Sequence, residues 1–121
     1  SVFHKFKKQA KDSGKVHPFE GSNEFLRDFI YVGDVCQIIE KMMYIDQTGI
    51  WNVGTGETTS FEDIANSIAK KYNSEVEPIK MPENLTKQYQ KYTCSDNTKL
   101  IKDIGNFKFT KPKEWIETWK D

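Results

Sequence analysis

Residues 27–35 read Arg-Asp-Phe-Ile-Tyr-Val-Gly-Asp-Val, and within them the chain changes from one kind of secondary structure to another. The β-branched and aromatic residues of 27–32 are typical of a short strand. Gly33 and Asp34 interrupt this pattern, and Asp34 is placed to cap the following helix or to favour its positive N-terminal end. The stretch therefore predicts a strand that leads directly into a helix, which is a unit of mixed α/β proteins.

Outward from this stretch, apolar residues at helical spacing alternate with short strand-like segments. The expected helices are 2–13, 34–43, 61–72, 96–105 and 110–119, with capping or terminating residues at Gly14, Ser60, Asp96, Gly105 and Thr110. Strands are expected at 49–53 and 76–79, a loop is expected at 83–95, and the methionines at 42 and 43 are expected to fill the core. Because helices alternate with a few short strands, we expect an α/β fold, or α+β as an isolated piece. So few strands cannot build a full parallel sheet, which indicates that the chain is part of a larger fold.

Length and composition limit the classes of protein that this chain can represent. A length of 121 residues fits a single domain, 1–121, and the hydrophobic share of 36% makes the 13% of aromatic residues important for packing. The formal net charge of zero provides no field that would gather nucleic acid or an acidic membrane. Cys36 and Cys94 have neither zinc-ligand nor disulfide-framework spacing, which is typical of a reduced, cytoplasmic protein. The sequence also predicts no membrane segment.

The common catalytic and cofactor motifs are missing from the sequence. Gly54-x-Gly56 is not followed by the third glycine of a dinucleotide fingerprint, because Thr59 stands at that position. A Walker phosphate loop is absent, and no Ser-His-Asp or Cys-His arrangement is supported beyond the presence of those residue types. The sequence therefore predicts no catalytic, cofactor-binding or metal-binding residue in this chain.

Several residues are candidates for ligand contacts, each with a structural alternative. In the run Phe19, Glu20, Gly21 and Ser22, the glycine allows close backbone approach, and the flanking residues offer a flat ring and a hydroxyl, although the run also suits a plain turn. Arg27 is the only arginine, and its planar group suits a diphosphate or carboxylate as well as an ion pair with Asp28 or Asp34.

Tyr89 and His4 complete the set of candidates. Tyr89 lies in a polar segment without helical or strand periodicity, where a ligand contact and rim packing are both compatible with the sequence. His4 lies on the first expected helix, and an ordinary surface position is its structural alternative. The lysines of the same helix are typical of a solvated face rather than of a phosphate-binding patch.

The order and spacing of three segments resemble the C-terminal half of extended short-chain dehydrogenases, over essentially the whole chain. These segments are Phe-Glu-Gly-Ser at 19–22, the 27–35 stretch, and Trp-Asn-Val-Gly-Thr-Gly at 51–56. The 27–35 pattern is shared by many sugar epimerases and dehydratases. The narrower resemblance, to ADP-L-glycero-D-manno-heptose 6-epimerases, rests on 19–22 and on Tyr-Gln-x-x-Thr-x-x-Asp at 89–96.

The resemblance implies an NADP-dependent parent enzyme of lipopolysaccharide precursor synthesis. Such an enzyme oxidises the heptose at its sixth carbon and returns the hydride to the opposite face. The family's Rossmann NADP-binding domain, its Tyr-x-x-x-Lys pair and a further catalytic Lys all precede the region that matches Ser1 onward. This segment is therefore expected to bind no NADP alone and to be inactive, and the parent is expected to be a homo-oligomer.

Only substrate contacts carry over from the family to this chain. The resemblance implies that His4, 19–22, Arg27 and Tyr89 surround an ADP-sugar, with Arg27 at the diphosphate and Phe19 at the base or ribose. Tyr89 would close over the ligand. Two other functions stay open: a fragment of a UDP- or dTDP-sugar epimerase or dehydratase, and a non-catalytic interaction module.

Overall fold

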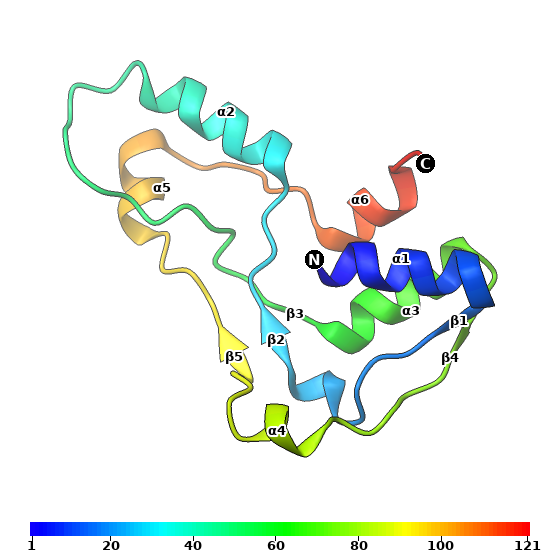
Figure 1. The fold of residues 1–121 in the computed structure, drawn as a ribbon. Coiled ribbons are helices and arrows are strands. Elements are labelled where there is room, and N and C mark those ends of the chain that lie inside the picture. The colour runs from blue at the N-terminus through cyan, green and yellow to red at the C-terminus, as the bar shows by residue number, and fades with distance from the viewer.

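The computed structural model describes residues 1–121 and consists mainly of short helices joined by extended segments (Figure 1). The elements in chain order are α1 (Val2–Ser13), β1 (Lys15–Val16), η1 (Ser22–Glu24), β2 (Leu26–Arg27), α2 (Val32–Met42), β3 (Thr59–Ser60), α3 (Phe61–Lys71), β4 (Glu75–Val76), α4 (Glu83–Thr86), β5 (Tyr92–Thr93), α5 (Thr98–Ile104) and α6 (Pro112–Thr118). This mixed α/β composition confirms the expected fold class. No helix combines the length and the hydrophobicity that crossing a membrane requires.

The main core lies where α1, α3 and α6 pack together, beside β1 (Figure 1). Its eight buried residues are Phe6, Ala10, Val16, Ile64, Ala65, Ile68, Ala69 and Ile116. Aromatic rings extend this core, since Phe3 contacts Trp115 and Trp119 edge-to-face at 5.2 and 6.5 Å between ring centroids. The few large rings in a chain with little other apolar material thus contribute much of the packing.

The strands form two small sheets that connect the parts of the chain. β1 pairs with β4 in parallel, and the isolated bridge between Phe19 and Ile79 continues in the same direction. In the second sheet β2 is central, antiparallel to β3 and parallel to β5. Because every strand has two residues, the sheets position loops, and the helices supply most of the buried surface.

Three of the expected helix ends are confirmed by the geometry of their caps. Gly14 has the left-handed φ of 68° and closes α1 by donating to Ala10 O. Ser60 Oγ accepts a hydrogen bond from Asp63 N at 3.0 Å and caps α3. Gly105, with φ 85°, ends α5. These ends follow from local residue types, which explains why the sequence predicts them correctly.

The strand expected at 27–32 and the two helix caps expected nearby are wrong. Within that range only Arg27 lies in a strand, and Val32 already belongs to the first turn of α2. Asp34 does not cap α2, because its carboxylate accepts hydrogen bonds from Thr110 N at 2.7 Å and Thr110 Oγ1 at 3.0 Å. Thr110 therefore does not cap α6, whose N-cap is Lys111. Asp34 does lie in the first turn of α2, which agrees with the alternative expectation of a negative charge near the positive N-terminal end.

Four further expectations are wrong or only partly met, where contacts between distant segments decide the structure. Residues 49–53 lie in no strand, because no neighbouring strand pairs with them. The strand expected at 76–79 is reduced to Val76 in β4 and the single bridge at Ile79. The loop expected at 83–95 contains α4 and β5, and Met43, expected in the core, is 77% exposed.

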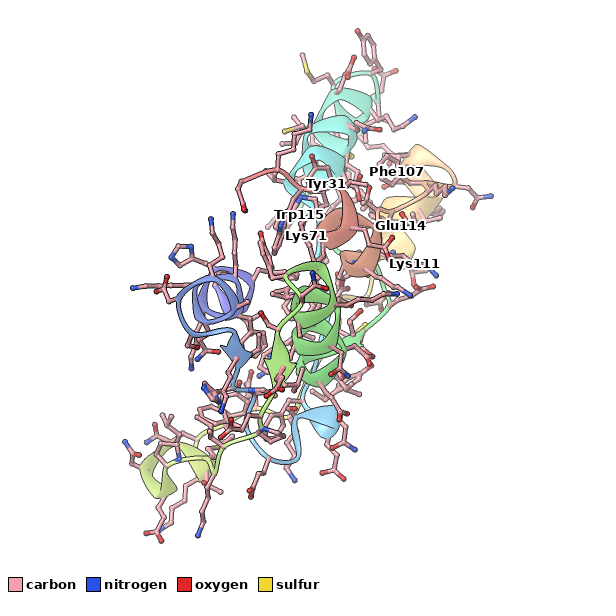
Figure 2. The ribbon with its side chains drawn as sticks, turned by 90° about the vertical axis from the view of Figure 1, so that its right-hand side faces the viewer. Tyr31, Lys71, Phe107, Lys111, Glu114 and Trp115 are labelled. Carbon is pink, nitrogen blue, oxygen red and sulfur yellow. The ribbon has the colours of Figure 1, made fainter.

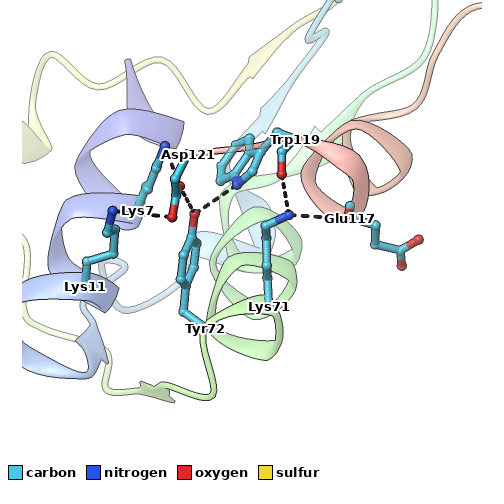
Figure 3. A network of polar contacts seen from close by, with 7 residues as sticks. All are labelled: Lys7, Lys11, Lys71, Tyr72, Glu117, Trp119 and Asp121. Atoms are coloured by element: carbon cyan, nitrogen blue, oxygen red, sulfur yellow. Dashed lines mark hydrogen bonds and ion pairs between the residues drawn. The ribbon is translucent and has the colours of Figure 1, made fainter.

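Hydrogen bonds and ion pairs connect Trp119 and Asp121, near the end of the sequence, to side chains of α1 and of the end of α3 (Figure 3). Asp121 accepts from Lys7 at 2.8 Å, Lys11 at 3.3 Å and Tyr72 Oη at 2.7 Å. The hydrogen bond from Lys7 is the main cause that holds the pKa of Asp121 well below its usual range. Trp119 Nε1 in turn donates to Tyr72 Oη at 3.0 Å, so the polar contacts continue the aromatic packing of the core.

Candidate functional site

Four aromatic rings from separate parts of the chain meet at one place, and we call Phe19, Phe25, Phe61 and Tyr89 the aromatic cluster. Tyr89 is its centre, with ring centroids 4.8 Å from Phe25, 6.3 Å from Phe19 and 6.2 Å from Phe61. Such distances and tilted or edge-to-face arrangements are typical of favourable aromatic packing. The cluster therefore fixes the otherwise polar segment around Tyr89 against the body of the chain.

Backbone contacts explain how the rings reach this position. Phe61 N donates to Phe25 O at 3.0 Å, which ties the start of α3 to the residue after η1. Glu20 N donates to Ile79 O at 2.8 Å, and this bond extends the bridge between Phe19 and Ile79. The cluster thus depends on pairing between segments that are far apart in the sequence.

Arg27 lies over two rings of the aromatic cluster. Its guanidinium carbon is 5.5 Å from the centroid of Phe61 and 5.7 Å from that of Tyr89, which is cation–π distance. The Nη1 group donates to Leu26 O at 3.0 Å, and Nη2 donates to Gln90 O. The guanidinium group is thereby oriented by rings and carbonyls, and it retains further N–H donors.

The alternative of an ion pair between Arg27 and Asp28 or Asp34 is wrong. The structure contains four ion pairs, and Arg27 takes part in none of them. Asp34 binds Thr110, and Asp28 binds other donors. The positive charge of Arg27 is therefore not neutralised by a carboxylate within the chain, which leaves it available to an anionic group.

The run at 19–22 forms a defined turn. Gly21 has φ 78° and precedes η1, a conformation that a residue with a side chain rarely adopts. Ser22 is buried, whereas Glu20 and Gly21 are exposed next to the ring of Phe19. The turn interpretation of this run is therefore correct, and its contact with a ligand stays a prediction.

Tyr89 is partly buried, and its ring lies beneath the guanidinium group of Arg27. Burial raises the pKa of the Tyr89 hydroxyl, and the positive charge of Arg27 opposes this effect in part. The hydroxyl is consequently protonated at neutral pH and can donate a hydrogen bond to a ligand.

His4 is the predicted residue that the structure does not join to the others. It is exposed on α1 and takes part in none of the hydrogen bonds or aromatic contacts that hold the aromatic cluster. Its neighbour Lys5 does reach the site, with Nζ 5.2 Å from the centroid of Phe19. The structure thus brings together Phe19, Arg27 and Tyr89, and a role for His4 in binding stays a prediction.

Asp28, beside the site, accepts several hydrogen bonds at once, and nothing in its residue type or spacing predicts this role. Its carboxylate accepts hydrogen bonds from Thr55 N at 3.0 Å, Thr55 Oγ1 at 2.6 Å, Gly56 N at 2.9 Å and Ser95 N at 3.2 Å. Burial raises the pKa of Asp28, but these hydrogen bonds outweigh it and hold the pKa below its ordinary value. Asp28 therefore joins β2, which carries Arg27, to two distant loops.

Gly54 is the residue in the sequence that indicates a close approach at Asp28. A Cβ atom at Gly54 would lie 2.3 Å from Ser95 Cβ and 2.9 Å from Asp28 Oδ2. Close approach of two backbones is a common reason for glycine in a turn. The aromatic cluster offered a weaker signal, because Phe25 and Phe61 look like ordinary core residues in the sequence.

The hollows in the surface lie around α6, away from the aromatic cluster. Their volumes are about 480, 300 and 680 Å³. Figure 2 labels Phe107 and Glu114, which line the first, and Tyr31 and Trp115, which line the second. None is lined by Arg27 or by a ring of the cluster. The candidate binding residues therefore lie outside these three hollows.

Comparisons with known proteins place the fold. No family model matches the sequence. The structure is similar to the ADP-L-glycero-D-manno-heptose-6-epimerase of Helicobacter pylori, with a TM-score of 0.77 and 26% identity, over 96% of this chain and 35% of that chain. The chain has the fold of the C-terminal substrate domain of extended short-chain dehydrogenases.

Two further solved structures show the same fold at lower identity. The UDP-glucose 4-epimerase of Thermotoga maritima, solved with UDP-glucose, has a TM-score of 0.76 and 22% identity, over 97% of this chain and 37% of that chain. An NAD-dependent NDP-hexosamine 5,6-dehydratase of tunicamycin biosynthesis has a TM-score of 0.76 and 19% identity, over 96% and 37%. The chain thus spans little more than a third of the length of the proteins that it matches.

Proposed function

We propose that this chain is the sugar-nucleotide-binding part of an NADP-dependent epimerase that inverts the sixth carbon of ADP-glycero-manno-heptose. The observation that carries the proposal is the position of Arg27. Its guanidinium group forms no ion pair with a carboxylate and lies over Phe61 and Tyr89 beside the 19–22 turn. A cation beside flat rings matches a ligand that joins a diphosphate to a base. The likeness to the heptose epimerase of Helicobacter pylori supports this choice among sugar nucleotides.

In the proposed complex each candidate residue has a distinct role. Arg27 donates to the diphosphate, for which its planar group is better suited than a lysine. Phe19 provides a face for the base or ribose, and Tyr89 closes over the ligand and donates its hydroxyl. Glu20, Gly21 and Ser22 contribute backbone and side-chain hydrogen bonds from the adjacent turn. His4 contributes from α1 only if the ligand extends beyond the ring of Phe19.

The proposal assigns binding to this chain and chemistry to the rest of the parent enzyme. Hydride transfer requires the nicotinamide and an acid–base pair close to the sugar carbon. Arg27 is surrounded by aromatic rings and by Thr59 and Thr93 of the neighbouring strands, and burial raises the pKa of the Tyr89 hydroxyl, which keeps it protonated and unable to accept a proton at neutral pH. We therefore expect the chain alone to bind the sugar nucleotide without converting it. A homo-oligomeric parent in lipopolysaccharide precursor synthesis belongs to the same proposal.

Calorimetric titration of the folded chain with ADP-sugar, ADP and UDP tests the binding role. Arg27→Ala is expected to weaken binding of the ADP ligands by about 1.5–3 kcal/mol, the range for a charge-assisted hydrogen bond. Lys91→Ala is the matched control, because it removes an exposed positive charge near the site that contacts neither ring nor Arg27. Equal losses in the two variants would mean that net charge alone attracts the ligand.

Two alternatives have specific outcomes in the same titration. Tighter binding of UDP or dTDP ligands than of ADP ligands would support a UDP- or dTDP-sugar epimerase or dehydratase, which the match to the UDP-glucose 4-epimerase also allows. No heat with any nucleotide, from a sample whose circular dichroism shows the expected helices, would favour a non-catalytic interaction module.

A further inference from the structure

A polar groove between α3 and α6 carries more positive than negative side chains, and we call it the lysine groove. Its volume is about 680 Å³, and Ile64 and Pro112 are the only apolar residues that line it. Its charged residues are four lysines and two carboxylates: Lys70, Lys71, Lys111, Lys113, Asp63 and Glu117. Because the whole chain has no net charge, this formal excess of two positive charges is a local feature of the groove.

Three of the four lysines form no ion pair within the chain. Lys70, Lys111 and Lys113 are exposed, and none of them takes part in the four ion pairs of the structure. Lys71 is fixed in place, since its Nζ donates to Glu117 O at 3.2 Å and thereby joins the end of α3 to the end of α6. Figure 2 labels Lys71 and Lys111, which line the groove from the two helices. The positive charges are therefore available to an anionic partner.

Two of these lysines lie where they do not favour their own helix. Lys111 is the N-cap of α6 and Lys113 lies in its first turn, where Glu114 is the one acidic residue. The aligned peptide dipoles of a helix repel positive charge at its N-terminal end, so acidic residues are the usual choice there. Residues that oppose the local rules of stability are expected at functional sites. An external anion therefore explains the two lysines better than the stability of α6 does.

The spacing of the lysines suits an extended chain better than a single small anion. Lys71 lies level with Glu117, and Lys113 precedes Glu117 by four residues on α6. At a rise of about 1.5 Å per residue, Lys113 and the pair at the end of α3 are roughly 6 Å apart along the helix axis. In an extended chain, residues i and i+2 face the same side and lie about 6.6 Å apart. Two glutamates separated by one residue therefore match the two ends of the groove.

We propose that the lysine groove binds an extended, acidic segment of a partner protein, with alternate carboxylates at its two ends. A polypeptide fits better than a nucleic acid, because the chain as a whole is neutral and no aromatic ring lines the groove on which a base would stack. Neither Arg27 nor a ring of the aromatic cluster lines the groove, so the proposal does not depend on the sugar nucleotide.

Fluorescence anisotropy with a labelled peptide of alternating glutamate and glycine tests the proposal. We expect saturable binding to the folded chain at low salt, and binding at least about tenfold weaker for the matched peptide with glutamine in place of glutamate. Salt should weaken the binding of the glutamate peptide, because it screens exposed charges. No binding, equal affinity for the two peptides, or tighter binding of a labelled single-stranded DNA of the same length would overturn the proposal.

Variants test whether the peptide binds in the lysine groove. The double variant Lys111→Gln, Lys113→Gln is expected to weaken binding of the glutamate peptide at least about fivefold, and Lys70→Gln at the other end at least about twofold. The double variant Lys41→Gln, Lys87→Gln is the matched control, since it removes equal charge from exposed lysines outside the groove that form no ion pair. Urea unfolding checks that each variant is folded. Equal losses of affinity in the two double variants would refute binding in the groove.

Discussion

Replacing Asp28 by asparagine removes the carboxylate that joins Arg27's strand to two loops. One oxygen accepts from the backbone and hydroxyl of Thr55, and the other accepts from the N–H groups of Gly56 and Ser95. Asparagine keeps one acceptor, while its NH₂ group must face two N–H donors at the other position. Two charge-assisted hydrogen bonds are lost at about 1.5–3 kcal/mol each.

The expected loss of unfolding free energy is about 2–4 kcal/mol for Asp28→Asn, because the carboxylate is only partly buried and water compensates in part. Urea unfolding followed by circular dichroism near pH 7 measures this loss. Asp46→Asn is the control, since Asp46 is exposed, and it should change stability by no more than about 0.5 kcal/mol. A loss below about 1 kcal/mol for Asp28→Asn would refute the role of Asp28 as a junction.

The dependence on pH provides a second test of the same carboxylate. The pKa of Asp28 is lower in the folded state than its ordinary value of 3.8, so the ionised form stabilises the fold. This contribution is fully present above the unfolded-state pKa and disappears as the pH falls through the folded-state pKa. The stability difference between the wild type and Asp28→Asn should therefore be constant from about pH 7 to pH 5 and shrink below about pH 3.8.

Two further substitutions test caps and contacts in the fold. Ser60→Ala should cost about 1 kcal/mol of unfolding free energy, because Asp63 N loses its hydrogen-bond acceptor at the start of α3. Ser60→Thr should retain most of this hydrogen bond. Equal stability of the wild type and Ser60→Ala would contradict the prediction. Thr110→Val should cost about 1 kcal/mol by removing the hydroxyl that donates to the buried Asp34, as measured by urea unfolding, whereas Thr110→Ser keeps that donor and should cost less.

Local patterns in the sequence predict the helices well, because the information that forms them is itself local. Gly14 and Ser60 act through contacts within a few residues of the helix that they end or begin. The turn at Gly21 also follows from a single residue type that tolerates positive φ. The candidate residues Phe19, Arg27 and Tyr89 lie near one another, and their contact with a sugar nucleotide stays a prediction.

Contacts between distant segments account for the failures. Asp34 has the right residue type for a cap, but Thr110 provides better donors from far along the chain. Asp28 lies in the 27–35 stretch, but its role is not visible there, because its partners come from two loops that the sequence alone does not place. Residues 49–53 have a strand-like composition, yet a strand also requires a neighbour, and a composition does not supply one.

The arrangement of the core also constrains the order in which the chain can fold during synthesis. Phe6 on α1 packs in one core with Ile116 on α6, almost at the opposite end of the chain. During synthesis α1 must consequently keep part of its apolar stripe exposed, or shielded by a chaperone, until α3 and α6 have emerged from the ribosome. Pairing across such a separation slows folding, and the exposed stripe of α1 is the surface on which premature aggregation would begin.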